Sequence, residues 1–207
     1  MPSRNVIKID VEQSFYHVYA RGHGRQRIFR DDEDYRVFLN LLKRHLSVNE
    51  VTDKYGKPYA HLRGQVELLS YCLMENHFHL LLYQSEKGAM TRLMRGVMTS
   101  YSSYYNKKYD SSGPLFETRY KASLISTDAY LMHISRYIHL NPTDWRAYPY
   151  SSISACFGIG GQTEWLQQDR IIELFGTLPV YADFLDDTED YEKSLDDIKY
   201  ELANTIL

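Results

Sequence analysis

Cysteine is scarce in this sequence, and long apolar runs, internal repeats and low-complexity segments are absent from it. The two cysteines, Cys72 and Cys156, make neither a disulfide framework nor a zinc cluster, which favours a reducing, cytoplasmic setting. No stretch reaches the roughly 18 consecutive apolar residues of a membrane-spanning helix. Residues 1–6 lack the apolar core of a secretion signal. The sequence therefore predicts a cytoplasmic globular protein without a membrane partner.

The net charge is small, but the two ends of the chain differ strongly. The formal charge is −3, yet residues 151–207 hold 12 acidic and 3 basic side chains, whereas residues 1–150 hold 15 acidic and 21 basic ones. A basic body suits a polyanionic partner, and an acidic tail is able to compete for the same basic surface. The alternative is that the acidic helices only serve solubility.

Strand and helix patterns alternate in a recognisable order along the first part of the chain. Strands are predicted at residues 13–20, 66–73, 77–83 and 118–125. Helices are predicted after a cap at Asp31 or Asp32, with apolar residues at helical spacing from Tyr35 to Leu46, at residues 88–109 and at residues 127–141. The order strand–helix–strand–strand–helix–strand is that of a split βαβ unit. The predicted fold class is α+β, ferredoxin-like, with a central antiparallel sheet flanked by helices.

The pattern weakens after Pro142, which ends the last of these helices. Residues 145–152 are rich in aromatic and small side chains and are predicted to pack back on the body. A short helix is expected near residues 164–175, and residues 179–206 are expected to be helical and acidic. We therefore divide the chain into a domain over residues 1–152 and a C-terminal helical acidic extension over residues 153–207.

The residues that organise the chain are Asn76-His77-Phe78-His79-Leu80. Side chains alternate between the two faces of a strand, so His77 and His79 share one face while Phe78 and Leu80 share the other. Two imidazoles about 7 Å apart along a strand suit a shared divalent ion. The alternative is that they form the polar face of a half-exposed strand.

A second set of polar side chains lies on the helix predicted at residues 127–141. Tyr130, Ile134, Tyr137 and Asn141 are three or four residues apart and therefore form one stripe. A phenol is a candidate nucleophile, and an amide oxygen one turn away is a candidate third metal ligand. Each has a structural alternative, because Tyr137 suits a helical core and Asn141 suits the end of a helix before Pro142.

Two motifs in this order and at this separation resemble those of the HUH-type single-tyrosine transposases, the IS200-like transposase superfamily. Residues 74–81, MENHFHLL, resemble the histidine–hydrophobic–histidine motif, and residues 136–142, RYIHLNP, resemble the tyrosine helix. Residues 16–22, 102–109 and 113–122 add supporting similarity. The likeness spans about residues 12–152 and is nearest to the REP-associated branch, domesticated relatives that act on extragenic palindromes.

The resemblance implies a transposase-like DNA strand transferase that cleaves and rejoins single-stranded DNA next to hairpins through a 5′-phosphotyrosine. Tyr137 matches the catalytic tyrosine, His77 and His79 match the metal-binding histidines, and Asn141 matches a third ligand to Mg or Mn. The chain departs from the family where Glu75 replaces an expected proline and where some members carry glutamine in place of Asn141. The implied partner is single-stranded or hairpin DNA, bound by a homodimer with shared sites or by a monomer.

Basic side chains near these motifs are the candidates for phosphate contacts. Arg21, Arg25 and Arg27 lie in a glycine-punctuated loop, and Arg119 and Lys121 are expected to share one face of the strand at residues 118–125. Lys107 and Lys108 are expected at a solvated helix end instead.

Two other functions remain open from the sequence. One is a non-catalytic single-stranded nucleic-acid-binding module, because ferredoxin-like sheets stack bases on exposed aromatics and the chain has 19 tyrosines. The other is a metal-dependent hydrolase that activates water, with Tyr137 only structural.

Overall fold

A computed structural model describes residues 9–159 and 164–203. The expectations for residues 1–6, for residues 160–163 at the predicted domain boundary and for the chain end after residue 203 lie outside this range. The strands are β1 (Ser14–Arg21), β2 (Val66–Met74), β3 (His77–Gln84) and β4 (Lys121–Ile125). They form one sheet in the order β2-β3-β1-β4, and every neighbouring pair is antiparallel. The predicted ferredoxin-like α+β class is confirmed.

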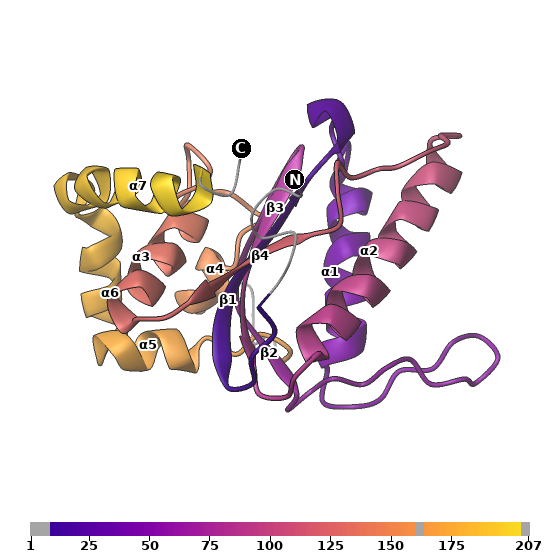
Figure 1. Ribbon diagram of the computed structural model, residues 1–207, viewed down its shortest axis with the longest axis horizontal. Helices are drawn as coiled ribbons and strands as arrows, with labels where there is room; N and C mark the ends of the chain where they lie inside the picture. Colours follow the sequence, from indigo (N-terminus) through magenta and orange to yellow (C-terminus); the bar gives the residue numbers. More distant parts are fainter. Residues whose placement is uncertain (1–8, 160–163, 204–207) are drawn as a thin grey trace.

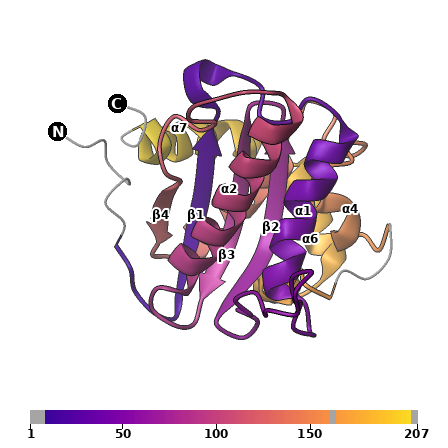
Figure 2. The same cartoon turned by 90° about the vertical axis from the view of Figure 1, so that its right-hand side faces the viewer.

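Helices cover both faces of this sheet (Figure 1). On one face lie α1 (Asp32–Leu46) and α2 (Ala89–Lys108), side by side in Figure 2. On the other lie α3 (Asp128–His139), α4 (Ile153–Cys156), α5 (Asp169–Phe175), α6 (Leu178–Asp186) and α7 (Thr188–Ala203). None of the described helices is long and apolar enough to cross a membrane.

The alternation along β3 divides the protein into two apolar cores. Phe78 and Leu80 are fully buried in the core that α1 and α2 close. Leu81 points the other way, into the core that α3 and the C-terminal helices close. His77 and His79 lie on the same side as Leu81, as the period of a strand requires. The predicted facing of the histidine motif is therefore confirmed.

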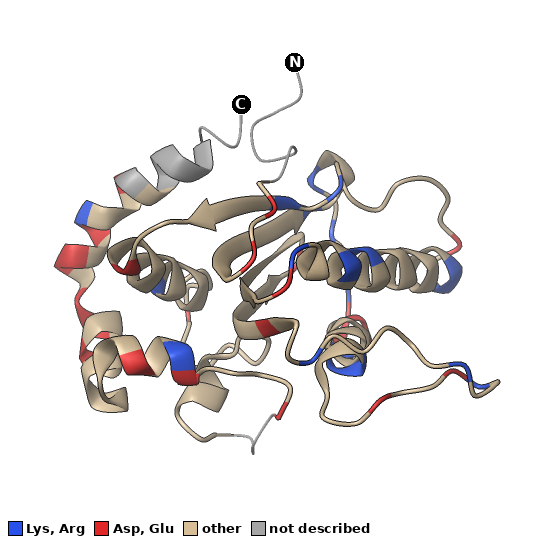
Figure 3. Cartoon of the chain, turned by 60° about the horizontal axis from the view of Figure 1, so that its bottom comes forward, with Lys and Arg blue, Asp and Glu red and all other residues tan. Residues whose placement is uncertain are grey.

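The C-terminal helices share the second core with α3. Ile134 of α3, Ile171 of α5, Tyr181 of α6 and Ile198 of α7 are all buried in it. Figure 3 shows that acidic positions are frequent along these outer helices. The segment before them packs back on the body as predicted, because the Ser152 N–H donates to the Tyr71 carbonyl at 2.9 Å. The division into residues 1–152 and 153–207 stays a prediction.

Two of the differences between predicted and observed element ends affect the candidate site residues. β4 begins at Lys121 and not at residue 118, because the register that pairs Tyr19 with Lys121 does not continue. The Arg21 carbonyl instead accepts a hydrogen bond from the Glu117 N–H at 2.9 Å, in a shifted register. Arg119 therefore precedes the strand, and the prediction that it shares a strand face with Lys121 is wrong. α3 ends at His139, two residues before Asn141, since a residue that precedes proline disfavours the helical conformation.

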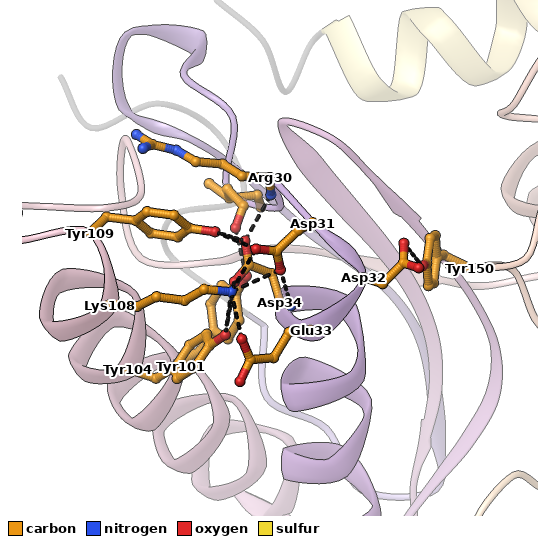
Figure 4. Close-up of polar contacts among 11 residues, drawn as sticks. Arg30, Asp31, Asp32, Glu33, Asp34, Tyr101, Tyr104, Lys108, Tyr109 and Tyr150 are labelled. Carbon is orange, nitrogen blue, oxygen red and sulfur yellow. Dashed lines mark hydrogen bonds and ion pairs between the residues drawn. The ribbon is translucent and has the colours of Figure 1, made fainter.

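Lys108, at the end of α2, contacts three carboxylates at the start of α1 (Figure 4). Its ammonium lies 2.8 Å from Asp31, 2.9 Å from Glu33 and 2.9 Å from Asp34. Burial opposes the charge of Lys108, but these hydrogen bonds outweigh it and raise the pKa of the ammonium. The expectation of a solvated helix end is wrong for Lys108.

Replacing Lys108 is expected to destabilise the contact between α1 and α2. The Asp34 carboxylate is fully buried, and Lys108→Met leaves it without its cation. The other two carboxylates, Asp31 and Glu33, are half-exposed, so their loss of the cation contributes little. We therefore expect the unfolding free energy to fall by about 2 kcal/mol. Chemical denaturation measures the loss, and Lys107→Met, on an exposed neighbour, is the matched control. Equal stability of the two variants would contradict the prediction.

Candidate active site

The two histidines lie at the start of β3, next to the two-residue turn Glu75-Asn76. Their ring centroids are 5.0 Å apart. His77 Nδ1 lies 2.6 Å from the Asn76 side-chain oxygen, the shorter of its ring's two contacts with an amide oxygen, which favours the tautomer that carries the proton on Nδ1. His77 Nε2 then holds a lone pair, and it lies 3.2 Å from the side-chain oxygen of Asn141.

Tyr137 approaches the histidines from α3. Its ring meets His79 edge-on, with ring centroids 5.4 Å apart. Ile134 and Tyr130, one and two turns earlier, pack in the same core and hold this face of α3 against the sheet. The phenol and the imidazole pair therefore converge, as the two motifs predict, and in this structure both come from one chain.

These groups surround a cavity of about 250 Å³. It is lined by Tyr19, Ala20, Arg21, Arg25, His77, His79, Glu117, Thr118, Lys121 and Tyr137. Three of the predicted phosphate contacts, Arg21, Arg25 and Lys121, thus lie at one cavity with the histidines and the tyrosine. Glu117 is the one carboxylate among the described lining residues.

The loop after β1 brings two of these arginines to the cavity. A Cβ on Gly22 would lie 2.2 Å from the Gln26 carbonyl oxygen, so only glycine allows the loop to fold back this tightly. Arg25 has a φ of 61°, a left-handed conformation that side chains rarely adopt. The loop is therefore held in a strained form that turns Arg25 toward the cavity.

Burial keeps both histidines neutral. It lowers the pKa of His77 to about 4 and the pKa of His79 well below its usual value, and the charge of Arg21 acts in the same direction on both. Burial raises the pKa of Tyr137, whereas Arg21 and Asn141 oppose this rise. At neutral pH the site therefore holds uncharged imidazoles, which is the form that binds metals, and a protonated phenol.

Two of the predicted phosphate contacts lie away from this cavity. Arg27 is exposed and forms an ion pair with Glu75 at 3.1 Å. Arg119 lines a different cavity, between α2 and the segment before β4. Position in the sequence did not distinguish Arg27 and Arg119 from the three basic residues that line the cavity. For Arg119 the reason is that the course of residues 115–120 depends on their contacts with β1.

His17 is the residue of the site that sequence analysis missed as a functional candidate. It is fully buried on β1, and its Nε2 lies 2.8 Å from Nδ1 of His79. This hydrogen bond engages one nitrogen of His79 and leaves Nε2 as the free one. Buried partners of this kind orient metal-binding histidines and fix their tautomer. The signal that would have pointed to His17 is a third histidine on the strand predicted at residues 13–20, in addition to the two of the histidine motif.

Replacing His17 is expected to weaken metal binding while the fold persists. His17→Phe keeps the ring in the core but removes the hydrogen bond to His79, so we expect Mn²⁺ affinity to fall about 10- to 100-fold. Calorimetric titration with Mn²⁺ measures this, and His61→Phe in the loop before β2 is the control. An unchanged affinity would show that His17 only fills the core.

The residues present fit a divalent ion. Among the described residues no three His, Cys, Asp or Glu side chains are placed to hold a metal, so any site here depends on the Asn141 oxygen as a third donor. Two ligands at right angles around one ion, each roughly 2.1 Å from it, lie about 3 Å apart. The 3.2 Å between His77 Nε2 and Asn141 Oδ1 matches this spacing. Two facing acceptors repel each other unless a proton or cation lies between them.

An antiparallel α+β sheet with a histidine pair and a tyrosine at one cavity is the arrangement that the transposase resemblance predicts. The model of the family described as "Transposase IS200 like" matches residues 10–141. The chain belongs to this family.

A comparison with solved structures bears on the fold. A solved structure described as a REP-associated tyrosine transposase bound to a REP hairpin is similar, with a TM-score of 0.52 and 12% sequence identity. The match covers 77% of this chain and 88% of that one. At this identity the likeness shows the fold alone. The comparison with curated proteins gives no match.

Proposed function

We propose that this transposase-family protein cleaves and rejoins single-stranded DNA next to a hairpin through a 5′-phosphotyrosine. The convergence of Tyr137 with His77 and His79 in an arginine-lined cavity carries the proposal. The similar structure is described as bound to a REP hairpin, which supports a DNA hairpin as the partner. A homodimer stays open, although one chain supplies every group of the site.

Tyr137 is the proposed nucleophile. Its oxygen attacks the scissile phosphorus in line, so that the tyrosine–phosphorus bond forms, the bond from phosphorus to the 3′ oxygen breaks, and that oxygen takes up a proton. The phosphotyrosine keeps the energy of the phosphodiester bond, so attack by another 3′-OH rejoins strands without ATP. The phenol must lose its proton during attack, and the positive charge of Arg21 favours that loss.

His77, His79 and Asn141 would hold a divalent ion, Mg or Mn, at this site. When bound, such an ion draws negative charge from a non-bridging phosphate oxygen in the transition state. Two imidazoles and one amide suit Mn²⁺ better by ligand type, whereas Mg²⁺ prefers oxygen ligands and water. Arg21, Arg25 and Lys121 would contact the flanking phosphates and fix the strand for in-line attack.

The geometry disfavours the two alternatives. A base-stacking module needs an open sheet face with aromatics, but helices cover both faces here (Figure 1). A hydrolase with a merely structural Tyr137 leaves unexplained why this phenol lines the same cavity as the histidines.

Incubation with a hairpin that carries a single-stranded flank and Mn²⁺, followed by a denaturing gel, tests the proposal. A covalent protein–DNA adduct, with label retained when it is attached on the 3′ side of the cut, is the expected result. Cleavage without an adduct would favour the hydrolase, and binding without cleavage would favour the module.

A further inference from the structure

A second cavity, outside the candidate active site, lies between α2 and residues 114–120. Its volume of about 740 Å³ exceeds that of the active-site cavity. Thr91, Arg95, Thr99, Ser102 and Asn106 line it along α2. These residues are three or four positions apart, so they form one stripe along the helix. Arg119 lies on the opposite wall. We call this cavity the α2 groove.

The side chains of the α2 groove suit phosphate and sugar. Along α2, hydroxyl and amide groups flank Arg95, and Arg119 lies across from them. Apolar side chains such as Met98 and Leu115 complete the lining, and no acidic residue occurs among the described residues that line it. Arg95 and Arg119 are exposed, and within residues 9–159 and 164–203 neither forms an ion pair. Arg92, three residues before Arg95 on the same helix and not among the residues that line the groove, is by contrast paired with Glu86 at 3.7 Å. The groove therefore presents unneutralised positive charge, which complements a polyanion.

The α2 groove lies next to the active-site cavity. Thr118 lines both cavities, and Glu117 and Arg119 on either side of it line one each. A nucleic acid whose scissile phosphate reaches Tyr137 is therefore able to extend past Thr118 along α2.

The aromatic residues of the α2 groove indicate which form of DNA it fits. Phe116 is 7% exposed and Tyr120 is 5% exposed, so neither offers a free ring face to an unpaired base. Proteins that bind single strands depend on such faces. A paired strand keeps its bases stacked inside the duplex and offers only sugar and phosphate, which hydroxyl, amide and guanidinium groups bind.

We propose that the α2 groove binds the phosphate backbone of the duplex stem of the DNA hairpin whose flanking single strand enters the active-site cavity. This inference rests on the proposed function. From Thr91 to Asn106 the helix rises roughly 22 Å, the length of about six phosphates along one strand of a duplex. Arg95 and Arg119 each neutralise one of these phosphates.

Charge removal in the α2 groove tests the proposal. We compare Arg95→Ser/Arg119→Ser with Arg92→Ser, which removes the same kind of charge from the same helix outside the groove. Binding is measured without metal, so that no strand is cut, on a stem-containing hairpin and on an unpaired strand that has only the flanking sequence. The double variant is expected to bind the hairpin about 10- to 100-fold more weakly, to reduce the slope of log affinity against log salt by about 1.8, and to bind the unpaired strand as before.

The outcomes separate this proposal from the proposed function. If the double variant and the Arg92→Ser control bind the hairpin with equal affinity, the groove does not bind the stem and the assignment is overturned. This holds whether the groove binds a protein segment or nothing. An equal loss on hairpin and unpaired strand also overturns it, because the stem would not be the occupant. Adduct formation by the unaltered protein on the short unpaired strand tests the proposed function independently of the groove.

Discussion

Tyr137→Phe is expected to abolish the covalent protein–DNA adduct and to reduce strand cleavage by about 10⁴-fold or more, since it removes the oxygen that bonds to phosphorus in the proposed reaction. The phenyl ring keeps the edge-on contact with His79, so the cavity retains its shape. DNA affinity without metal and Mn²⁺ affinity are therefore expected to stay within about twofold of the unaltered protein. A denaturing gel with labelled hairpin DNA measures the adduct, and calorimetry measures both affinities.

The matched control for this prediction is Tyr130→Phe. Tyr130 lies on the same stripe of α3 and packs in the same core, but it does not line the active-site cavity. This variant is expected to form the adduct at an undiminished level. If Tyr137→Phe still forms an adduct, another residue is the nucleophile. If it cleaves DNA without an adduct, water is the nucleophile and Tyr137 is structural.

The side of each element on which the histidines and the tyrosine lie was predictable, because short-range periodicity determines it. Alternation along β3 puts His77 and His79 on one face, and the spacing on α3 turns Tyr137 toward the sheet. The order of the elements then implied the sheet that brings them together. Asn141 was predicted on the same stripe, and its approach to His77 depends on the helix ending two residues earlier.

The rest of the site depends on contacts between residues far apart in sequence. His17 and His79 are 62 residues apart, and only the pairing of β1 with β3 reveals their hydrogen bond. Arg119 and Lys121 have the same sequence spacing as two residues on one strand face, but β4 starts between them. The carboxylates that bind Lys108 come from the start of α1, which a reading of α2 alone does not reveal.

The C-terminal extension is tied to the tyrosine helix through Arg136, the residue before Tyr137. Its guanidinium is fully buried and donates to the Phe184 and Asp187 carbonyls at 3.1 and 3.3 Å. It also donates to the carboxylate of Asp190 at 2.6 Å. The same group lies over the Phe184 ring, 3.9 Å from its centroid. A single side chain of α3 thus holds the end of α6 and the start of α7.

Arg136→Met is expected to lower the unfolding free energy by about 3 kcal/mol. Methionine fills much of the space, but the Phe184 and Asp187 carbonyls each lose a hydrogen bond from the buried guanidinium, and the half-exposed Asp190 loses its cation. Because α6 and α7 pack on α3, hydrogen exchange is expected to rise in these three helices and not in α1 or α2. The orientation of Tyr137 depends on the same helix, so the yield of adduct is expected to fall as well.

Arg146→Met is the matched control for this change. Arg146 also forms an ion pair with the extension, through Asp186 of α6, but both side chains are more than half exposed, at 61% and 52%. Exposed pairs contribute roughly 0 to 1 kcal/mol, so this variant is expected to remain close to the unaltered protein in denaturation. If both variants lose the same free energy, the buried contacts of Arg136 do not hold the extension. If only Arg136→Met is destabilised and its exchange rises in α3, α6 and α7, the acidic extension is a structural support of the tyrosine helix.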